Sequence, residues 1–287
     1  MATHDRFDLD RWIAEFPLAR LRDEGREFVL RRRDHMPQEY ADEQAVAAHI
    51  ELMQPKWEIV VGPADVAINE QLRGELSAAG ERPQRRVPTD VAVWAKGEPS
   101  VRAVTKVGGL PYRPLDSLWP GADTGQPLRF VGQLSFVDSR DILADLPGDV
   151  LLVFGDDDAL LVEPERLRFE WWSLTTEPLL ARAPEVDQPL EPFFAALHRT
   201  EDWDDTVFEG TKIGGVPNFI QDEEVPSGRF IGTLGSISVP TDRRHPFVNV
   251  AAPRGWSRDN DLMIGDMGCL YLFMESNGTI LPLSQCY

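Results

Sequence analysis

After about residue 85, short apolar runs alternate with segments rich in Pro and Gly. Runs of this length and composition, bounded by turn residues, predict strands joined by short connections. The predicted strands lie at 91–94, 129–134, 150–154, 168–172, 230–234 and 269–274. Asn277-Gly278 follows the last of these and indicates a type I′ hairpin turn. Residues 192–199 are an exception, because their pattern predicts a helix that interrupts the strands.

The region before these strands has a different pattern. Apolar positions in residues 8–53 recur mostly at helical spacing. Residues 65–79 have the same spacing, and Gly80 stands where such a helix would end. We therefore predict an α+β fold in which N-terminal helices precede a duplicated, mainly antiparallel β-sheet unit. The predicted boundaries are 1–85 for the mostly helical region and 86–287 for the sheet domain.

An internal repeat is the most informative feature of the sequence. Residues 105–111 read Thr-Lys-Val-Gly-Gly-Leu-Pro, and residues 211–217 read Thr-Lys-Ile-Gly-Gly-Val-Pro. Two later landmarks recur in the same order, namely Arg-Phe-Val-Gly at 129–132 with Arg-Phe-Ile-Gly at 229–232, and Gly148 with Gly268 before an apolar run. Three landmarks in one order predict two copies of a β-rich unit, at about 100–180 and about 205–287, packed as a pseudo-symmetric pair.

The glycines of these landmarks have a structural and a functional interpretation. A Gly-Gly pair before an apolar residue and Pro permits a turn with positive φ or a close backbone approach. Gly132 and Gly232, inside predicted strands, indicate bulges or close packing. The alternative is a ligand cleft between the two copies, and we favour the structural interpretation. The candidate ligand-binding residues of that alternative are Gly108, Gly109, Gln133, Gly214, Gly215 and Asp266, with His245 as a further polar group.

The sequence contains none of the catalytic motifs that we sought. It has no G-x-S-x-G nucleophile elbow, no Walker A motif and no H-E-x-x-H pair. The five His are isolated, and two Cys make neither a disulfide framework nor a Cys-based zinc site. Cys269 lies in an apolar run that predicts a buried thiol. We therefore predict no catalytic residue, no metal and no cofactor, and we lean towards a protein that is not an enzyme.

The charge narrows the choice of partner. The chain has 48 Asp and Glu against 29 Lys and Arg, and its net charge of −19 is spread along its length. Nucleic acids and anionic membranes attract positive surfaces, so this balance argues against both partner classes. It leaves open a basic protein partner. The N-terminus has no apolar signal core and no apolar run spans a bilayer, so we expect a cytoplasmic protein.

Acidic residues gather in three predicted loops. The candidate partner-binding residues are Asp156, Asp157, Asp158, Trp203, Asp204, Asp205, Asp222, Glu223 and Glu224. An aromatic residue among charges, such as Trp203, is a common composition for an interface anchor. The competing interpretation is that these segments are solvated loops and a linker between the copies. Asp156 to Asp158 could also form a weak site for a hard cation.

Several of these segments in combination resemble the YwqG-like proteins, a bacterial domain of unknown function. The resembling segments are 106–111 (Lys-Val-Gly-Gly-Leu-Pro), 118–120 (Leu-Trp-Pro), 130–134 (Phe-Val-Gly-Gln-Leu), Pro147-Gly148 and 265–268 (Gly-Asp-Met-Gly). The resemblance covers about residues 100–287 and implies an α+β fold with a duplicated sheet unit, without an established catalytic mechanism. Some relatives are encoded beside secreted polymorphic toxins, which implies an immunity role. The second copy departs from the pattern, since Thr233 replaces Gln133 and no Trp-Pro follows Pro217.

Three hypotheses for the function follow. The one that we favour is a non-catalytic cytoplasmic binding protein, an immunity protein that neutralises a basic toxin domain by direct protein–protein contact. The alternative is a small-ligand-binding protein or an enzyme with its site between the two repeats. The third is a housekeeping scaffold whose site cannot be recognised from sequence.

Overall fold

The computed structural model describes the second part of the chain, with gaps. The described residues are 74, 77–78, 80, 85–122, 125–161, 163–186, 189–203, 207–208, 210–221, 225–237 and 262–286. Most of the predicted helical region 1–85 therefore lies outside the described residues. Within the predicted helix 65–79, Ser77 and Ala78 are helical, and Gly80 follows them with a φ of 84°.

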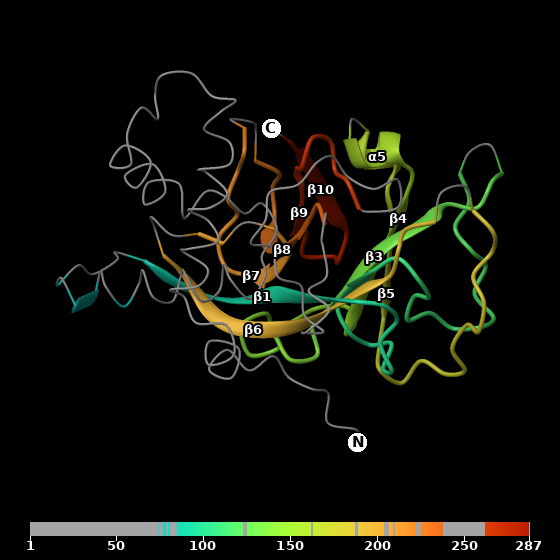
Figure 1. Cartoon of the computed structure of the whole chain (residues 1–287), viewed down its shortest axis with the longest axis horizontal. Helices are drawn as coiled ribbons and strands as arrows, with labels where there is room; N and C mark the ends of the chain where they lie inside the picture. The colour runs from blue at the N-terminus through green and yellow to red at the C-terminus, as the bar shows by residue number, and fades with distance from the viewer. Residues whose placement is uncertain are drawn as a thin grey trace, which may run out of the picture.

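Among the described residues, ten strands form one antiparallel sheet in the order β10-β9-β8-β7-β1-β6-β2-β3-β4-β5 (Figure 1). The strands are β1 (Arg86–Lys96), β2 (Lys106–Val107), β3 (Arg129–Ser135), β4 (Val150–Gly155), β5 (Arg168–Trp172), β6 (Phe193–Trp203), β7 (Lys212–Gly214), β8 (Arg229–Gly235), β9 (Cys269–Met274) and β10 (Ile280–Gln285). Two short helical segments, α5 (Asp157–Leu161) and η4 (Pro164–Arg166), connect β4 to β5. The strands predicted from the apolar runs are confirmed as parts of β1, β3, β4, β5, β8 and β9.

The predicted α+β class is wrong, because the regular secondary structure of the described residues is almost entirely strand. The predicted helix at 192–199 is also wrong, since this segment begins β6, which pairs with β1 over its whole length. Burial along this segment alternates as in a strand, because Phe193 and Ala195 are buried while Phe194 between them is only partly buried. Arg199 faces Asp90 of β1 and donates to both of its carboxylate oxygens. Pairing with a long neighbouring strand therefore overrides the local helical preference.

The sheet curls until its two edges approach each other. Nε1 of Trp171, on edge strand β5, donates to the carbonyl of Gly278, in the loop before β10 (3.3 Å). The Ser284 hydroxyl of β10 donates to the carbonyl of Leu160 in α5. The resulting shape is close to a closed barrel, in which α5 and η4 lie near β10 (Figure 1). Near-closure reduces the exposed edges that an open sheet would present.

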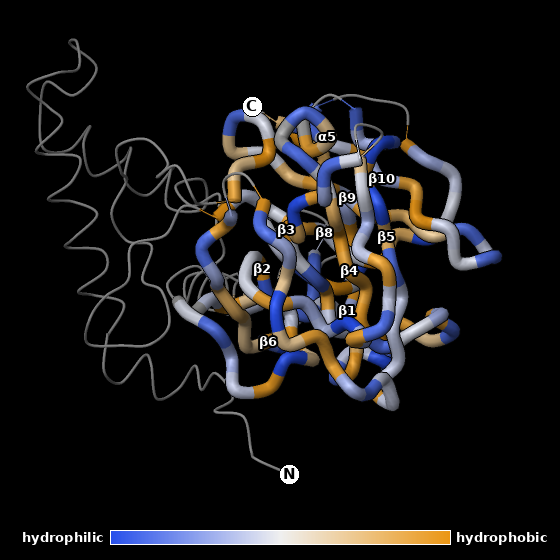
Figure 2. The backbone as a smooth tube through the Cα atoms, turned by 90° about the vertical axis from the view of Figure 1, so that its right-hand side faces the viewer, coloured by the Kyte–Doolittle hydropathy of each residue, from blue (hydrophilic) through white to orange (hydrophobic). Residues whose placement is uncertain are grey.

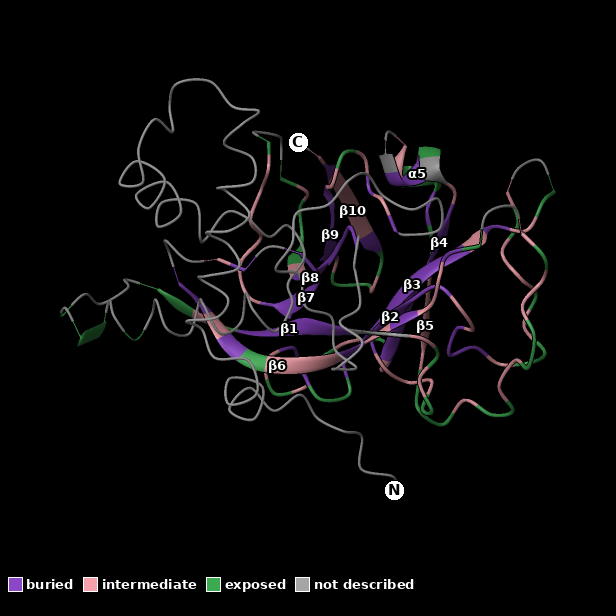
Figure 3. Cartoon of the chain, viewed as in Figure 1, coloured by how far each residue is buried: buried purple, intermediate pink, exposed green. Residues whose placement is uncertain are grey.

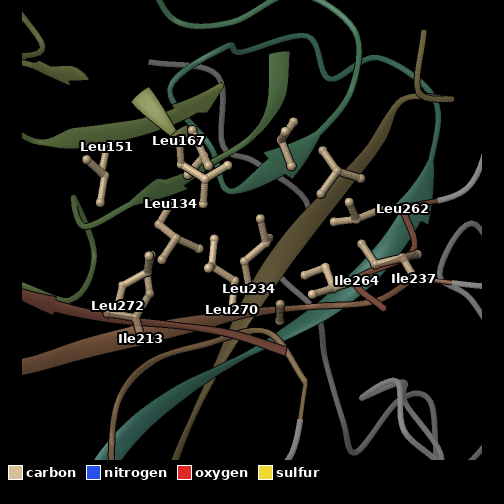
Figure 4. Packing of buried hydrophobic residues seen from close by; sticks show 14 of the residues in the cluster. Leu134, Leu151, Leu167, Ile213, Leu234, Ile237, Leu262, Ile264, Leu270 and Leu272 are labelled. Atoms are coloured by element: carbon tan, nitrogen blue, oxygen red, sulfur yellow. The ribbon is translucent and has the colours of Figure 1, made fainter. Parts of the chain in front are cut away.

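The main hydrophobic core lies inside this near-barrel and takes residues from both halves of the sheet (Figure 4). Leu134 and Leu151 come from β3 and β4, whereas Leu234, Leu270 and Leu272 come from β8 and β9. Every residue of β4 and β9 is buried, as Figure 3 shows for the strands compared with the surrounding loops. Burial on both faces explains why these strands read as continuous apolar runs, visible as orange stretches in Figure 2.

Two smaller clusters cover the outer faces of the sheet. One gathers residues of β3 and β4 with Tyr112 and Leu128, and the other gathers Cys269, Tyr271 and Phe273 of β9. The Cys269 thiol is buried, as predicted, and is not part of a disulfide. Trp171 packs against the main core and Trp172 against the first outer cluster, so adjacent Trp residues face opposite sides of β5.

The strand groups β2–β5 and β7–β10 share one pairing pattern. Lys106 pairs with Gln133 in the first group, and Lys212 pairs with Thr233 in the second. Each group has an irregularity just before a glycine, Gly132 or Gly232, which confirms the predicted bulges. The long strands are exchanged, because β1 precedes the first group but pairs with β7, while β6 precedes the second group but pairs with β2. Duplication of one unit stays a prediction.

The hairpin at Asn277-Gly278 is confirmed between β9 and β10, but its predicted turn type is wrong. A type I′ turn needs two consecutive left-handed residues. Here Gly278 has a φ of 89°, whereas Asn277 does not have a positive φ. The amide of Gly278 donates to the carbonyl of Glu275 (3.0 Å), and Thr279 pairs with Glu275 across the loop. The connection is therefore a longer loop with a single left-handed glycine.

Candidate functional site

The first Gly-Gly loop is folded around a buried lysine. The Lys106 side chain is fully buried, and its ammonium donates to Glu98 Oε2 and to the carbonyl of Leu110 (3.0 Å). Glu98 Oε1 accepts the backbone N–H of Leu110 (2.8 Å). Burial lowers the pKa of Lys106 from its usual 10.5, although the hydrogen bond to Glu98 acts in the opposite direction. We call Glu98, Lys106, Gly109 and Leu110 the first lock.

The second Gly-Gly loop repeats this arrangement. The Lys212 ammonium donates to Asp202 Oδ2 (2.7 Å) and to the carbonyl of Val216 (2.6 Å). Asp202 accepts the backbone N–H groups of Val216 (2.8 Å) and Phe208 (3.0 Å). Both charged side chains are almost completely buried. We call Asp202, Lys212, Gly215 and Val216 the second lock.

The locks explain why each motif contains two glycines. All four glycines of the two pairs have a φ between 59° and 74°, a region that side-chain-bearing residues rarely adopt. A Cβ atom on Gly109 would lie 1.6 Å from Glu98 Oε1, and one on Gly215 would lie 2.1 Å from Asp202 Oδ2. The predicted structural role, a positive-φ turn with a close approach, is confirmed at both sites.

The structure does not bring the two Gly-Gly pairs together. Beside the first pair, Gly97 donates to the carbonyl of Pro192, where β1 ends and β6 begins. At the second pair, Gly215 donates to the carbonyl of Pro88, near the start of β1. From Pro88 to Gly97 an extended strand runs for about 30 Å. The two loops therefore lie at opposite ends of the central strand pair.

The other candidate ligand-binding residues do not join the loops. Gln133 is buried, and its Oε1 accepts from the amide of Tyr112 (2.8 Å). Its Nε2 donates to the carbonyls of Arg102 (2.6 Å) and Val104 (2.7 Å), so this amide fixes the segments on either side of the first motif. Asp266 is exposed in the turn before β9. His245 lies outside the described residues.

The acidic candidates take separate places. Asp156 Oδ1 accepts from the amide of Ala159 (2.8 Å) and Oδ2 pairs with Arg166 (2.8 Å), so Asp156 caps α5. Asp157 opens that helix and Asp158 is exposed on it. Trp203 is buried at the end of β6, with the Arg86 guanidinium 4.9 Å above its ring. The candidates Asp204, Asp205, Asp222, Glu223 and Glu224 lie outside the described residues.

A loop that the sequence pattern did not mark as a site is held in place by a buried arginine. The Arg113 side chain is 2% exposed, and its guanidinium binds both carboxylate oxygens of Glu170 (2.7 and 3.0 Å). The same guanidinium donates to the carbonyls of Ser117 (2.8 Å) and Leu118. Trp172 Nε1 donates to Glu170 (3.0 Å), which fixes the carboxylate in turn. We call residues 113–120 the braced loop.

Trp119 anchors the other end of the braced loop. Its ring meets Phe154 edge to face, with centroids 5.2 Å apart, and its Nε1 donates to the carbonyl of Leu128 (2.8 Å). Between these fixed points the Leu118 side chain is 93% exposed, and Leu115 is 49% exposed. The sequence signal for this feature was the Leu-Trp-Pro segment at 118–120, and no Trp-Pro follows the second Gly-Gly motif. A buried, doubly paired arginine thus supports an exposed leucine.

Metal and membrane features are absent from the part of the chain that the structure describes. No three His, Cys, Asp or Glu side chains there are grouped so that they could hold a metal ion. No helix there is both long and apolar enough to cross a membrane.

Comparison with models of known families found a match for part of the chain. Residues 105–166 match the model of a family described as Domain of unknown function (DUF1963). This segment, which includes β2, β3 and β4, is similar to that domain. The match begins at the first Thr-Lys-Val-Gly-Gly-Leu-Pro motif, contains the braced loop, and continues through η4. No curated protein matches the chain. The expectation of a domain of unknown function is therefore supported over this segment.

Proposed function

We propose that this protein acts by binding another protein, as an immunity protein that neutralises a basic toxin domain by direct contact. The observation that carries the proposal is the braced loop, where buried groups hold an almost fully exposed leucine in place. An exposed apolar side chain on a fixed backbone loses little conformational freedom on binding, which favours affinity. The Arg113 side chain beneath this loop is buried, and the Glu170 carboxylate that pairs with it is 22% exposed.

The net charge of −19 supports a basic partner. Opposite charges on two proteins accelerate their encounter, and the acceleration falls as salt screens the attraction. An acidic inhibitor that must reach a basic toxin before the toxin acts would benefit from this effect.

The geometry offers less support for a ligand site between the repeats. The charged groups of both Gly-Gly motifs are hydrogen-bonded within their own locks, and the loops lie at opposite ends of β1 and β6. Gln133 directs its amide to backbone groups. These residues therefore stabilise the fold in this proposal.

The proposal includes three finer inferences from the sequence. We infer a YwqG-like domain extending beyond the matched residues 105–166 to about 287, with the two strand groups as copies of one unit. We also infer a cytoplasmic location. Location in the cytoplasm would place the protein where a toxin entering the cell, or made in it, would act.

Affinity capture tests the proposed function. The tagged full chain is incubated with native cell extract at low and high salt, and each protein that it retains is purified separately. We expect one basic protein in a 1:1 complex, with an association rate that falls as salt rises and an activity that is lost in the complex. Retention of a protein that stays active when bound, or co-purification of a small molecule without a protein, would contradict the proposal.

A further inference from the structure

We propose that the braced loop is the partner-binding surface, that Leu118 is its anchor, and that the partner presents an apolar pocket with a basic rim. This inference rests on the proposed function and adds the surface and the chemistry of the partner to it. Among the large hydrophobic residues that the structure describes, the side chain of Leu118 has the highest exposed fraction. Protein interfaces commonly centre on a few apolar side chains that enter pockets of the partner.

Three sets of contacts hold the braced loop in place. Arg113 donates to the carbonyls of Ser117 and Leu118. The amide of Leu115 donates to the carbonyl of Pro178 (2.9 Å). Trp119 is fixed by its contact with Phe154. A partner would therefore meet Leu118 in a position that is already set, so binding requires little ordering of the loop.

A neighbouring segment extends the apolar surface beside the loop. Tyr112 donates its hydroxyl to the carbonyl of Leu174 (2.8 Å), and Pro114 bridges to Leu179, so residues 174–179 run along the start of the braced loop. Leu174 is 46% exposed. In Figure 1 these loops project beyond β5 at the right-hand end of the molecule. Leu115, Leu118 and Leu174 thus belong to one region of the surface.

The charges of this region specify the partner's rim. Asp116 and Glu177 are exposed beside the leucines. Arg113 is buried and paired with Glu170, and Arg102 donates to the carbonyl of Leu180. Arg182, just beyond the second segment, is exposed and lies 3.5 Å from the carboxylate of Glu185. An incoming protein therefore meets an apolar centre with exposed acids beside it, which basic groups around an apolar pocket would complement.

The described residues of β7–β10 and their connections show no counterpart of this surface and supply the control. Phe219 follows the second Gly-Gly motif, and its ring packs onto Tyr271 and Phe273. Val225 lies further along the same connection and is 49% exposed. A substitution at Val225 thus changes an exposed apolar residue of the same protein outside the braced loop.

Site-specific photo-crosslinking, followed by binding measurements, tests the inference. A photoreactive amino acid is incorporated at position 118 or at position 225 of the full chain in living cells. We expect a covalent adduct with one basic protein from position 118 and none with that protein from position 225. The adduct protein is then purified, and its affinity is measured for wild type, Leu118→Asp, Leu118→Ala and Val225→Asp.

The variants are expected to separate clearly. Leu118→Asp and Leu118→Ala should weaken binding by about 30-fold or more, the effect of removing an interface hot spot, whereas Val225→Asp should stay within about 3-fold of wild type. Because Leu118 is exposed, both Leu118 variants should unfold at the wild-type temperature. Leu118→Ala introduces no charge, so it tests the contact even where an aspartate disturbs the loop. Equal adducts from both positions, no adduct from position 118, or unchanged affinity of the Leu118 variants would overturn the inference.

The two proposals fail in different ways. Should wild type bind a basic protein and inhibit it with Leu118 making no contribution, the proposed function stands and the surface is wrong. Should position 118 crosslink to one protein that stays active in the complex, the surface stands and the neutralising role is wrong.

Discussion

The two locks are built from the same parts but differ in their exposure to water. Each uses a buried lysine, a carboxylate, and the backbone of the residue after a Gly-Gly pair. In the first lock the Glu98 side chain is 42% exposed, whereas in the second lock Asp202 is 0% exposed. A repeated motif therefore sets the local geometry twice, while its surroundings decide how strongly the fold depends on each copy.

The difference arises from where each carboxylate comes from. Asp202 belongs to β6 itself, and the amide of Phe208 covers its second oxygen. Glu98 follows the end of β1 and reaches the lock from a connecting segment, on a side chain that is one methylene longer. Breaking a fully buried ion pair leaves an uncompensated charge in a region of low dielectric constant, whereas a half-exposed pair is partly replaced by water.

Isosteric neutralisation of the two carboxylates should give the largest effect. Asp202→Asn should lower the free energy of unfolding by about 3–5 kcal/mol, because Lys212 stays buried without a counter-charge. Glu98→Gln should lower it by about 1 kcal/mol, because water can reach that site. Urea unfolding followed by circular dichroism measures both. Glu201→Gln, next to Asp202 but partly exposed, is the matched control and should change stability by less than about 0.5 kcal/mol. Similar losses for Asp202→Asn and Glu98→Gln would remove the distinction between the locks.

Methyl groups added to the second glycines should give a smaller but parallel difference. Gly215→Ala should cost about 2–4 kcal/mol, because its φ of 74° is unfavourable for alanine and its Cβ would strike the enclosed Asp202 carboxylate. Gly109→Ala should cost about 1–2 kcal/mol, since the strain remains but Glu98 can swing towards water. Thermal unfolding of the two variants compares them. A larger loss for Gly109→Ala would show that Glu98 is held as firmly as Asp202.

The pH dependence of the first lock should give the smallest effect. Burial, partly offset by Glu98, leaves the pKa of Lys106 below its unfolded value of 10.5. Between these two pKa values the unfolded chain binds more protons than the folded protein, so this group makes the folded state more stable as pH rises. The unfolding free energy of wild type minus that of Lys106→Met should therefore increase as pH approaches 10.5. A difference that falls over this window would mean that the pairing with Glu98 outweighs burial.

Local sequence patterns predicted many of the elements but not the fold class. The apolar runs marked strands correctly because β4 and β9 are buried on both faces and have no polar alternation to obscure them. Gly132 and Gly232 marked bulges because another backbone approaches each of them closely. The prediction failed at 192–199, where Phe and Ala fit a helix as well as a strand and only pairing with β1 decides.

The residues of the candidate site were harder to predict, because the chain contains many residues of the same type. With 48 acidic residues in the chain, no sequence pattern singles out Glu98 or Asp202 as the partner of a buried lysine. The Leu-Trp-Pro segment marked the braced loop but did not show that Leu118 is exposed, because that exposure depends on Arg113 meeting Glu170 of β5. Long-range pairs of this kind join residues that are 57 positions apart, and local patterns carry no information about them.

The sequence by itself determined the positions where the backbone must turn, bulge or run extended, because those depend on glycine's freedom and on short apolar runs. Only the tertiary structure decided that β1 and β6 are exchanged between the two strand groups, and that one lock is enclosed while the other reaches water. The physical reason is that strand pairing and burial of charge are properties of residues brought together by the fold. Their free energies depend on the neighbours that the curled sheet supplies.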